Sequence, residues 1–279
     1  MSNQIKAKKY YGQNFLTNKA IPERIVKESG ITEETGVLEI GPGRGILTEF
    51  LSKTAKKVVA VEIDTDLIPF LNGKFKDSEN VTIIHGDILE TDIQSIIDTY
   101  FQNLPVSVCA NIPYYITSPI ILKLIEGNYS LNTITVMVQK EVARRLSAKK
   151  KSPDYSSLTV LCDYYATVKK LFDVPAGNFN PKPKVDSAVI RFDMRKNPPV
   201  NPIDKELFFT VIRLAFLHRR KTLLNCLVSS PDLKFTKDEI LQAIASAGFS
   251  PNIRGEEMDI YDFERLINSL PQPGKPAAN

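Results

Sequence analysis

Residues that build metal and disulfide sites are scarce in this 279-residue chain, which has three cysteines, two histidines and no tryptophan. Cys109, Cys162 and Cys226 each lie among apolar neighbours and follow no metal or redox spacing, which predicts reduced thiols inside the core. His85 and His218 are far apart in the sequence, and no Cys/His pairs occur at the spacing of zinc ligands. We therefore expect neither a metal site nor a disulfide-stabilised domain.

Long apolar runs are also lacking. No stretch approaches the ~20 consecutive apolar residues of a membrane span. Residues 1–11 are polar and contain lysine, without the apolar centre of a secretory signal. The sequence thus predicts a cytoplasmic protein without membrane association, which we expect to be a monomer. Its length suits one large and one small domain.

Basic residues are distributed unevenly. The net charge is +4, and residues 201–279 hold ten basic and ten acidic residues, so the surplus lies before residue 201. Each basic cluster alone is typical of a solvated surface, but several together indicate a track for a polyanion such as a phosphate backbone. The residues predicted to contact that backbone are Lys149, Lys150, Lys182, Lys184, Arg219, Arg220 and Lys221.

A glycine-rich turn at residues 39–45 reads Glu-Ile-Gly-Pro-Gly-Arg-Gly, between an apolar run and a helical pattern. Strand, glycine turn and helix in this order let the backbone approach a ligand closely. A dinucleotide fingerprint needs glycine where this chain has Ile46. The spacing therefore disfavours an NAD-dependent oxidoreductase and favours a ligand without a pyrophosphate.

Polar side chains follow three further apolar runs, at the points where the predicted strands end. Glu62 follows residues 58–61, Asp87 follows residues 81–86, and Asn111 follows residues 106–110. A carboxylate about 20 residues after the first glycine accepts hydrogen bonds from ribose hydroxyls, and Asp87 can accept from an adenine amino group. Each residue alone has an ordinary structural explanation, but together they predict a nucleoside site.

The segment Asn111-Ile112-Pro113-Tyr114 is suited to holding a planar amine. The amide oxygen of Asn111 and the carbonyl of Ile112 can accept hydrogen bonds from an exocyclic amino group, while Tyr114 stacks on the ring. Taken alone, this segment would be read as a turn that leaves a strand. Beside the predicted nucleoside site, it makes Asn111, Ile112 and Tyr114 the candidate catalytic residues, acting by positioning rather than as a strong base.

Apolar strands alternate with helical patterns over the first two thirds of the chain. This alternation predicts an α/β fold, with a mostly parallel, seven-stranded, Rossmann-like sheet covered by helices and a small all-helical C-terminal domain. The predicted division is a first domain at residues 1–196, a linker at 197–202, a helical domain at 203–270 and a flexible tail at 271–279. The predicted strands are residues 37–40, 58–62, 81–85, 106–110, 134–138, 167–174 and 187–194, and the predicted helices are 21–29, 46–53, 67–75, 93–101, 119–126, 141–148, 156–165, a stretch near 208–216, 240–247 and 260–270.

The loop at residues 177–185 is rich in proline. Such a loop is stiff, and we expect it to display the ring of Phe179 rather than bury it. The alternative is an ordinary hydrophobic contact beneath a long loop.

With these motifs the chain resembles the rRNA adenine N6-dimethyltransferases, most closely the bacterial members that act on the small subunit. The resemblance extends over nearly the whole chain, and its most specific segments are residues 12–16 and 179–185. It implies a Rossmann-like methyltransferase fold and S-adenosylmethionine as the methyl donor. It also implies two adjacent adenosines as targets, in the hairpin loop near the 3′ end of 16S rRNA in the 30S particle, during late small-subunit biogenesis.

The resemblance also implies roles for individual residues. Tyr114 and Phe179 would hold the target base between them. Residues 115–118 read Tyr-Ile-Thr-Ser where the family often has Asn-Ile-Ser-Thr, a departure that we interpret as neutral because the hydroxyls are kept. The cofactor site would be formed by Asn14, Leu16, Gly41, Gly43, Glu62, Asp87, Ile88 and Asn111.

Two alternatives remain within this resemblance. A macrolide-resistance methyltransferase of large-subunit rRNA shares the chemistry, but Gly12-Gln13, Pro119 and the Phe179 segment argue against it. A non-catalytic RNA-binding assembly factor would share the fold, and the intact segment at residues 111–114 argues against that alternative.

Overall fold

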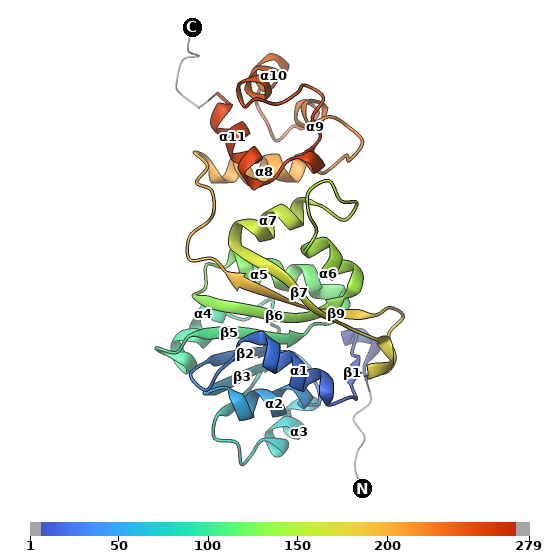
Figure 1. The fold of residues 1–279 in the computed structure, drawn as a ribbon. Helices are drawn as coiled ribbons and strands as arrows, with labels where there is room; N and C mark the ends of the chain where they lie inside the picture. Colours follow the sequence, from blue (N-terminus) through green and yellow to red (C-terminus); the bar gives the residue numbers. More distant parts are fainter. Residues whose placement is uncertain (1–6, 272–279) are drawn as a thin grey trace. The chain divides into compact units, whose positions relative to one another are not determined.

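The computed structural model describes residues 7–271, so the predicted tail beyond Pro271 lies outside the described residues. The described chain forms two compact units, one from residues 7–143 and 166–194 and the other from residues 144–165 and 195–271. Figure 1 draws the chain as a ribbon, and each unit has its own apolar core. None of the helices in residues 7–271 has the length and apolar character needed to cross a bilayer.

The first unit is built on the seven-stranded sheet that the sequence predicts. Its strand order is β4-β3-β2-β5-β6-β9-β7, and every neighbouring pair is parallel except those that β9 makes with β6 and β7. The central strands are mostly apolar and are buried along nearly their whole length, because both faces of the sheet are covered. The strands are β2 (Gly36–Ile40), β3 (Lys57–Glu62), β4 (Val81–His85), β5 (Val106–Asn111), β6 (Leu131–Gln139), β7 (Ala166–Val174) and β9 (Ser187–Met194).

The strand order changes direction between β2 and β5. From β2 the chain continues outward through β3 and β4, whereas β5 and β6 lie on the other side of β2. Ile40 at the end of β2 pairs with Ala110, directly before Asn111. Such a switch point leaves a crevice beyond the carboxyl ends of the strands, where ligands bind in open α/β sheets.

Helices cover both faces of this sheet. In Figure 1, α1 and α2 lie in front of it and α4 and α5 behind it. Leu47 and Leu51 of α2 share a buried cluster with Ile25 of α1 and with Val37 and Cys109 of the sheet. The helices of this unit are α1 (Ala20–Ser29), α2 (Ile46–Thr54), α3 (Leu67–Lys74), α4 (Ile93–Ile96), α5 (Thr117–Glu126) and the start of α6 (Lys140–Leu146).

The helix predicted over residues 93–101 is only partly α-helical. Asp92 caps α4 by accepting a hydrogen bond from the backbone N–H of Ser95, at 3.1 Å. From Ile97 to Phe101 the backbone continues as one wider π-helical turn. The change occurs although the apolar pattern is continuous, since Ile96, Ile97 and Phe101 are all buried.

A second, two-stranded sheet was not predicted. Strand β1 (Phe15–Leu16) pairs antiparallel with β8 (Phe179–Asn180), so residues far apart in sequence are joined. The prediction that Phe179 is displayed is wrong, because its side chain is only 5% exposed and packs in the same cluster as Leu16. Pairing with β1 brings the ring inward, which proline content alone does not reveal.

The second unit is helical, with Phe208, Ile240 and Phe263 fully buried in one core. The predicted capping box is present: the side chain of Thr236 caps Glu239, whose carboxylate accepts from the backbone of Thr236. The helices are α7 (Ser157–Tyr165), α8 (Lys205–Ala215), α9 (Leu223–Val228), α10 (Lys237–Ser246) and α11 (Ile260–Ser269). The short helix α9 was not predicted.

A single boundary near residue 196 does not describe how the chain divides. Residues 144–165 group with the C-terminal helices rather than with the sheet. Tyr155, Val160 and Tyr164 belong to the same core as Phe208, and the hydroxyl of Tyr155 donates to the carbonyl of Met258 at 2.9 Å. Within the predicted linker, Val200 is also buried in that core.

Candidate active site

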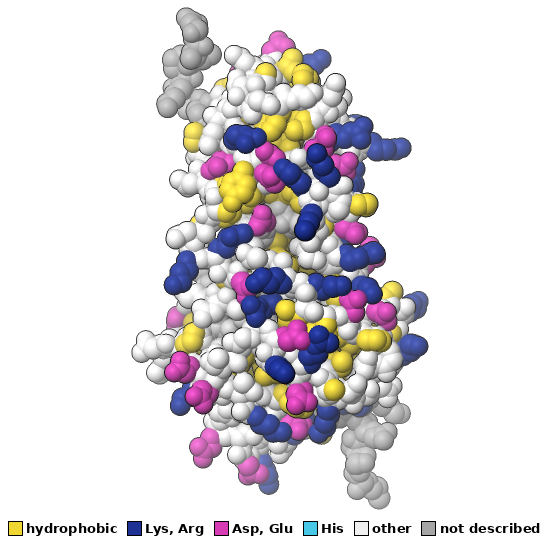
Figure 2. All heavy atoms as spheres, in the orientation of Figure 1, with side chains coloured by type: hydrophobic (Ala, Val, Ile, Leu, Met, Phe, Trp, Pro, Cys, Tyr) yellow, Lys and Arg dark blue, Asp and Glu magenta, His cyan; other side chains and the backbone are white. Residues whose placement is uncertain are grey.

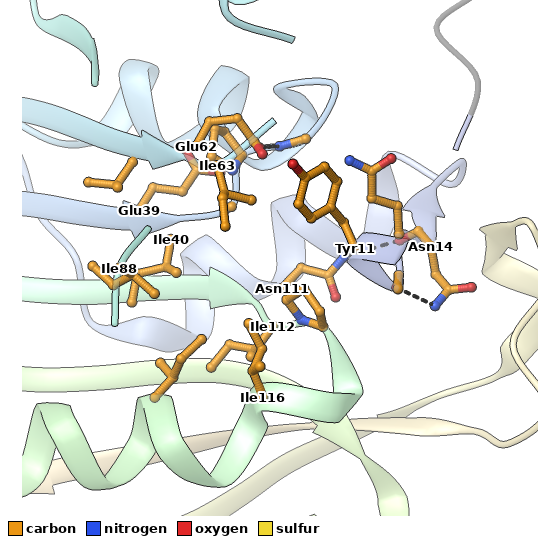
Figure 3. Close-up of a pocket in the computed structure, with 18 of the residues that line it drawn as sticks. Tyr11, Asn14, Glu39, Ile40, Glu62, Ile63, Ile88, Asn111, Ile112 and Ile116 are labelled. Carbon is orange, nitrogen blue, oxygen red and sulfur yellow. Dashed lines mark hydrogen bonds between the residues drawn. The ribbon is translucent and has the colours of Figure 1, made fainter. Parts of the chain in front are cut away.

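A cavity of about 360 Å³ lies at the carboxyl ends of the sheet strands. Its walls come from the N-terminal segment, the glycine turn and the ends of β3, β4 and β5 (Figure 3). The predicted cofactor and catalytic positions all line this one cavity, namely Asn14, Leu16, Gly41, Gly43, Glu62, Asp87, Ile88, Asn111, Ile112 and Tyr114. Phe179 is not among the residues that line it. A stacking role for Phe179 stays a prediction, and it would require the ring to leave its buried cluster.

The glycine turn brings backbone to the edge of the cavity. Gly41, Gly43 and Gly45 all have positive φ, at 64°, 57° and 68°, a region that favours glycine. A side chain added at Gly41 would meet nothing within 4 Å, whereas one at Gly43 would lie 3.1 Å from the ring of Phe15. The G-x-G-x-G spacing is thus a requirement of the backbone, and it leaves open space above Gly41 for a ligand.

Glu62 is held at the end of β3 by backbone donors. Its Oε2 accepts from the N–H of Gly43 at 3.0 Å and its Oε1 from the N–H of Asp64 at 2.9 Å. Burial raises the pKa of Glu62, and these backbone hydrogen bonds oppose the rise. A carboxylate has about four acceptor positions, so these backbone donors leave acceptor capacity for a neighbouring diol.

The wall around Asp87 combines one carboxylate with apolar side chains. Oδ1 of Asp87 accepts from the N–H of Leu89 at 2.9 Å, which fixes the turn after β4. Nζ of Lys123 in α5 donates to the carbonyls of Leu89 and Thr91, at 2.6 and 2.9 Å. Figure 3 shows Ile63 and Ile88 beside the cavity. A planar purine ring fits such a wall, with its amino group toward Asp87.

The N-terminal segment forms a wall that sequence reasoning missed in part. Nζ of Lys8 lies 2.6 Å from Asp64, and the amide of Gln13 donates to the same carboxylate at 2.9 Å. Burial alone would raise the pKa of Asp64, but the hydrogen bonds from Lys8 and Gln13 outweigh it and lower that pKa. In Figure 3 the ring of Tyr11 lies between Glu62 and Asn111. Since Asp64 follows Glu62 by two residues, this network is connected to the predicted ribose site.

The end of β5 presents the candidate catalytic segment. The amide nitrogen of Asn111 donates to the carbonyl of Asn14 at 3.4 Å, which directs its nitrogen to the N-terminal segment and makes Oδ1 the available acceptor. The hydroxyl of Tyr114 lies 2.7 Å from Oγ of Ser187. Ile112 is 1% exposed, and its N–H donates to the carbonyl of Met137. An acceptor and an aromatic ring are thus fixed beside each other.

Glu39 is a buried carboxyl group at the wall of the cavity, a position that no motif in the sequence predicts. It is 1% exposed, and burial raises its pKa to about 8. Among the described residues its Oε2 has no hydrogen-bond partner, nor has Oγ1 of Thr48 on α2. Figure 3 shows Glu39 beside Glu62, whose charge also raises this pKa. The group is therefore protonated in the folded protein over most of the neutral range.

All seven residues predicted to contact an RNA backbone are exposed. Lys150 is already bound to Asp259 and Asp262, and Arg219 to Glu256. Figure 2 shows basic side chains interspersed with acidic ones on the face drawn. The RNA contacts stay a prediction, and for Lys150 and Arg219 they would compete with ion pairs inside the protein. Within residues 7–271, no group of three or more His, Cys, Asp or Glu side chains is arranged to hold a metal ion.

The family model described as ribosomal RNA adenine dimethylase matches residues 4–269. A protein of Bacillus licheniformis named ribosomal RNA small subunit methyltransferase A is 47% identical over 94% of this chain and 91% of its own length. A protein of the same name from Streptococcus thermophilus is 44% identical over 96% of this chain and 93% of its own.

Solved structures show the same fold. A dimethyladenosine transferase from Plasmodium falciparum superposes with a TM-score of 0.76 and 28% identity, covering 90% of this chain and 95% of that one. The 23S rRNA methyltransferase ErmE superposes with a TM-score of 0.71 and 27% identity, covering 93% of this chain and all of that one. The extent of the family match and the identity to these relatives show that the chain belongs to the ribosomal RNA adenine dimethylase family.

Proposed function

We propose that this protein dimethylates N6 of two adjacent adenosines in the hairpin loop near the 3′ end of 16S rRNA, within the 30S particle, using S-adenosylmethionine. The observation that carries the proposal is the 44–48% identity, over nearly the full chain, to relatives named for the small subunit. We place this reaction in the cytoplasm, late in small-subunit biogenesis.

The fold alone does not choose between the two ribosomal subunits. The 23S enzyme ErmE has nearly the same TM-score as the dimethyladenosine transferase, 0.71 against 0.76. Its identity to this chain is 27%, however, whereas the relatives named for the small subunit reach 44% or more. Sequence identity therefore favours small-subunit rRNA as the substrate, whereas the shared fold does not discriminate between the two subunits.

The residues around the cavity fit S-adenosylmethionine. Glu62 has acceptor positions for the ribose hydroxyls, Asp87 and the apolar wall of Ile88 suit the adenine, and the open space above Gly41 suits the chain that carries the sulfonium. When bound, the cofactor supplies a methyl group on a positively charged sulfur. Glu62 and Asp87 place carboxylates on the wall of the cavity, which suits a ligand with a positive charge.

The catalytic segment would act on the target amine. The N6 lone pair of adenine is delocalised into the ring, which makes it a poor nucleophile. Hydrogen bonds from the amino group to Oδ1 of Asn111 and the carbonyl of Ile112 favour the localised lone pair. Tyr114, fixed through Ser187, holds the ring by stacking, an interaction worth ~1–3 kcal/mol per base in single-strand binders.

The reaction then needs positioning more than a base. The new N–C bond forms as the S–C bond breaks, and the amine becomes acidic enough to release its proton to water. The same acceptors must hold the monomethylated amine for the second transfer, in which one of its two N–H groups has been replaced by a methyl group. An unpaired loop suits this chemistry, because its bases can be turned out at low cost.

The test is methyl transfer from labelled S-adenosylmethionine to separate 30S and 50S particles that lack these methyl groups. We expect label in the 3′ hairpin of 16S rRNA, located by mass spectrometry as dimethyladenosine. Label in 50S particles would instead support the macrolide-resistance alternative. Binding to 30S without any transfer would support the non-catalytic assembly factor.

A further inference from the structure

Two tyrosines are exposed where the cavity opens to solvent. Tyr10 is 85% exposed and Tyr115 is 59% exposed, and both line the cavity. Single exposed apolar side chains are common on protein surfaces. Two aromatic rings at the opening of one binding cavity are unusual enough to indicate a ligand.

Tyr115 is held in place along one edge. It follows Tyr114 in the 3-10 turn Tyr114–Ile116, and its Cδ1 would lie 3.1 Å from a side chain added at Gly12. Gly12 has a positive φ of 59°, so the chain there leaves room for the ring. The remaining surface of the Tyr115 side chain, more than half of it, is open to solvent.

We propose that Tyr115, with Tyr10 as a second ring at the same opening, stacks an unpaired nucleobase that neighbours the target adenine in the RNA. This inference rests on the proposed function and adds a second base-binding position to it. Tyr114 is half-buried and bound to Ser187, which suits the base that reacts. Tyr115 is the next residue and faces solvent, which suits the base one nucleotide away.

The chemistry of the ring matches this ligand. Single-stranded nucleic acids are held by aromatic side chains on which successive bases stack, with little dependence on base identity. Two adjacent adenosines must be presented in turn, so one base waits while its neighbour reacts. On this proposal, Tyr115 is a source of affinity for RNA.

The experiment compares Tyr115→Ala with the unmodified protein, using 30S subunits from cells that lack this methylation. We expect kcat/KM for 30S subunits to fall about 5- to 140-fold, the range that ~1–3 kcal/mol of base stacking gives at 1.4 kcal/mol per tenfold. The Kd for S-adenosylmethionine, measured by calorimetry, should change less than about twofold on this scale. Tyr115→Phe restores the ring and should recover most of the loss, and Tyr10→Ala should show a smaller loss of the same kind.

Phe70→Ala is the matched control, because Phe70 is an exposed ring on α3 that does not line the cavity. The proposal is supported if Tyr115→Ala lowers kcat/KM for 30S subunits while its Kd for S-adenosylmethionine stays normal, and if Phe70→Ala leaves both quantities unchanged. An equally large rise in the Kd for S-adenosylmethionine would overturn the proposal, because the ring of Tyr115 would then contact the cofactor. Unchanged kinetics would also overturn it, because the ring would then contact no ligand. If the unmodified protein does not methylate 30S subunits, the proposed function itself fails, which is a distinct result.

Discussion

Replacing Glu39 by glutamine tests whether a carboxyl group at the cavity wall is kept neutral by the fold. The group is 1% exposed, its Oε2 has no partner among the described residues, and burial raises its pKa from the ordinary 4.5 to about 8. Glutamine has nearly the same shape as protonated glutamic acid and carries no charge at any pH. The variant Glu39→Gln should therefore fold as well as the unmodified protein in mild acid and better at alkaline pH.

The sign of the pH dependence that Glu39 gives to stability follows from proton binding in the folded and unfolded states. Below pH 4.5 both the folded and unfolded states hold the proton, so Glu39 does not make stability depend on pH. Between pH 4.5 and about 8 the unfolded state has released it while the folded state retains it, so stability decreases as pH rises. At 1.36 kcal/mol per pH unit, the whole window gives an upper bound of about 5 kcal/mol. Relaxation and water entry will reduce this value.

The assay is urea unfolding followed by far-ultraviolet circular dichroism, because the chain has no tryptophan to report by fluorescence. The free energy of unfolding is compared between Glu39→Gln and the unmodified protein from pH 5 to pH 8.5, so other titrating groups cancel. Glu49→Gln is the control, because three lysines surround Glu49 and its pKa is lowered rather than raised. A difference for Glu39→Gln that stays constant with pH, or that favours the unmodified protein at pH 8, would refute the reasoning.

Three further substitutions address the walls of the cavity. Gly41→Ala should weaken binding of S-adenosylmethionine. It should also destabilise the protein by about 1–2 kcal/mol, the cost of a left-handed backbone at a residue with a side chain. A calorimetric Kd that stays unchanged would contradict contact between that backbone and the cofactor. Lys8→Met removes the cation beside buried Asp64 and should raise the Kd for S-adenosylmethionine several-fold. Lys8→Arg keeps the cation, so its Kd should stay close to that of the unmodified protein. The difference in Kd between Lys8→Met and the unmodified protein should shrink in ~1 M salt. Ser187→Ala releases the hydroxyl of Tyr114 and should lower kcat with 30S subunits about threefold to tenfold, the usual ~0.5–1.5 kcal/mol of one hydrogen bond. A change in cofactor Kd for Ser187→Ala would show that it disturbs more than the target base.

The sheet could be predicted from sequence because its strands are buried on both faces. Residues 37–40 and 106–110 are mostly apolar runs with one polar residue each, Glu39 and Ser107, and the structure has strands there with at most one extra residue. The starts of the helices at residues 46 and 260 were predicted to the residue, whereas the helix that follows the capping box of Thr236 begins at Lys237, three residues before its predicted start. Strand ends then place Glu62, Asp87 and Asn111 at one rim, because parallel strands share their carboxyl edge.

What sequence could not predict depends on contacts between distant residues. Strand β1 has two residues, too few for any periodic pattern, and exists because it pairs with β8. The same pairing buries Phe179 against the expectation from its proline-rich loop. Likewise, Lys8 and Gln13 look like an ordinary polar start of the chain until Asp64 is found beside them. Local signals specify elements, whereas these features are set by tertiary packing.

The polar groups of the cavity are each held by one or two hydrogen-bond partners inside the protein before any ligand binds. Glu62 is held by Gly43 and Asp64, Asp87 by Leu89, and Asn111 by Asn14. Each retains an acceptor position, so a ligand need not order these side chains and loses less entropy on binding. Because Asp64 is held in turn by the N-terminal segment, the wall that includes the candidate catalytic amide of Asn111 and the wall that includes the predicted ribose acceptor are joined through one short stretch of chain. Disturbing that stretch should therefore affect binding of the cofactor and positioning of the target amine together, which substitutions at a single wall would not do.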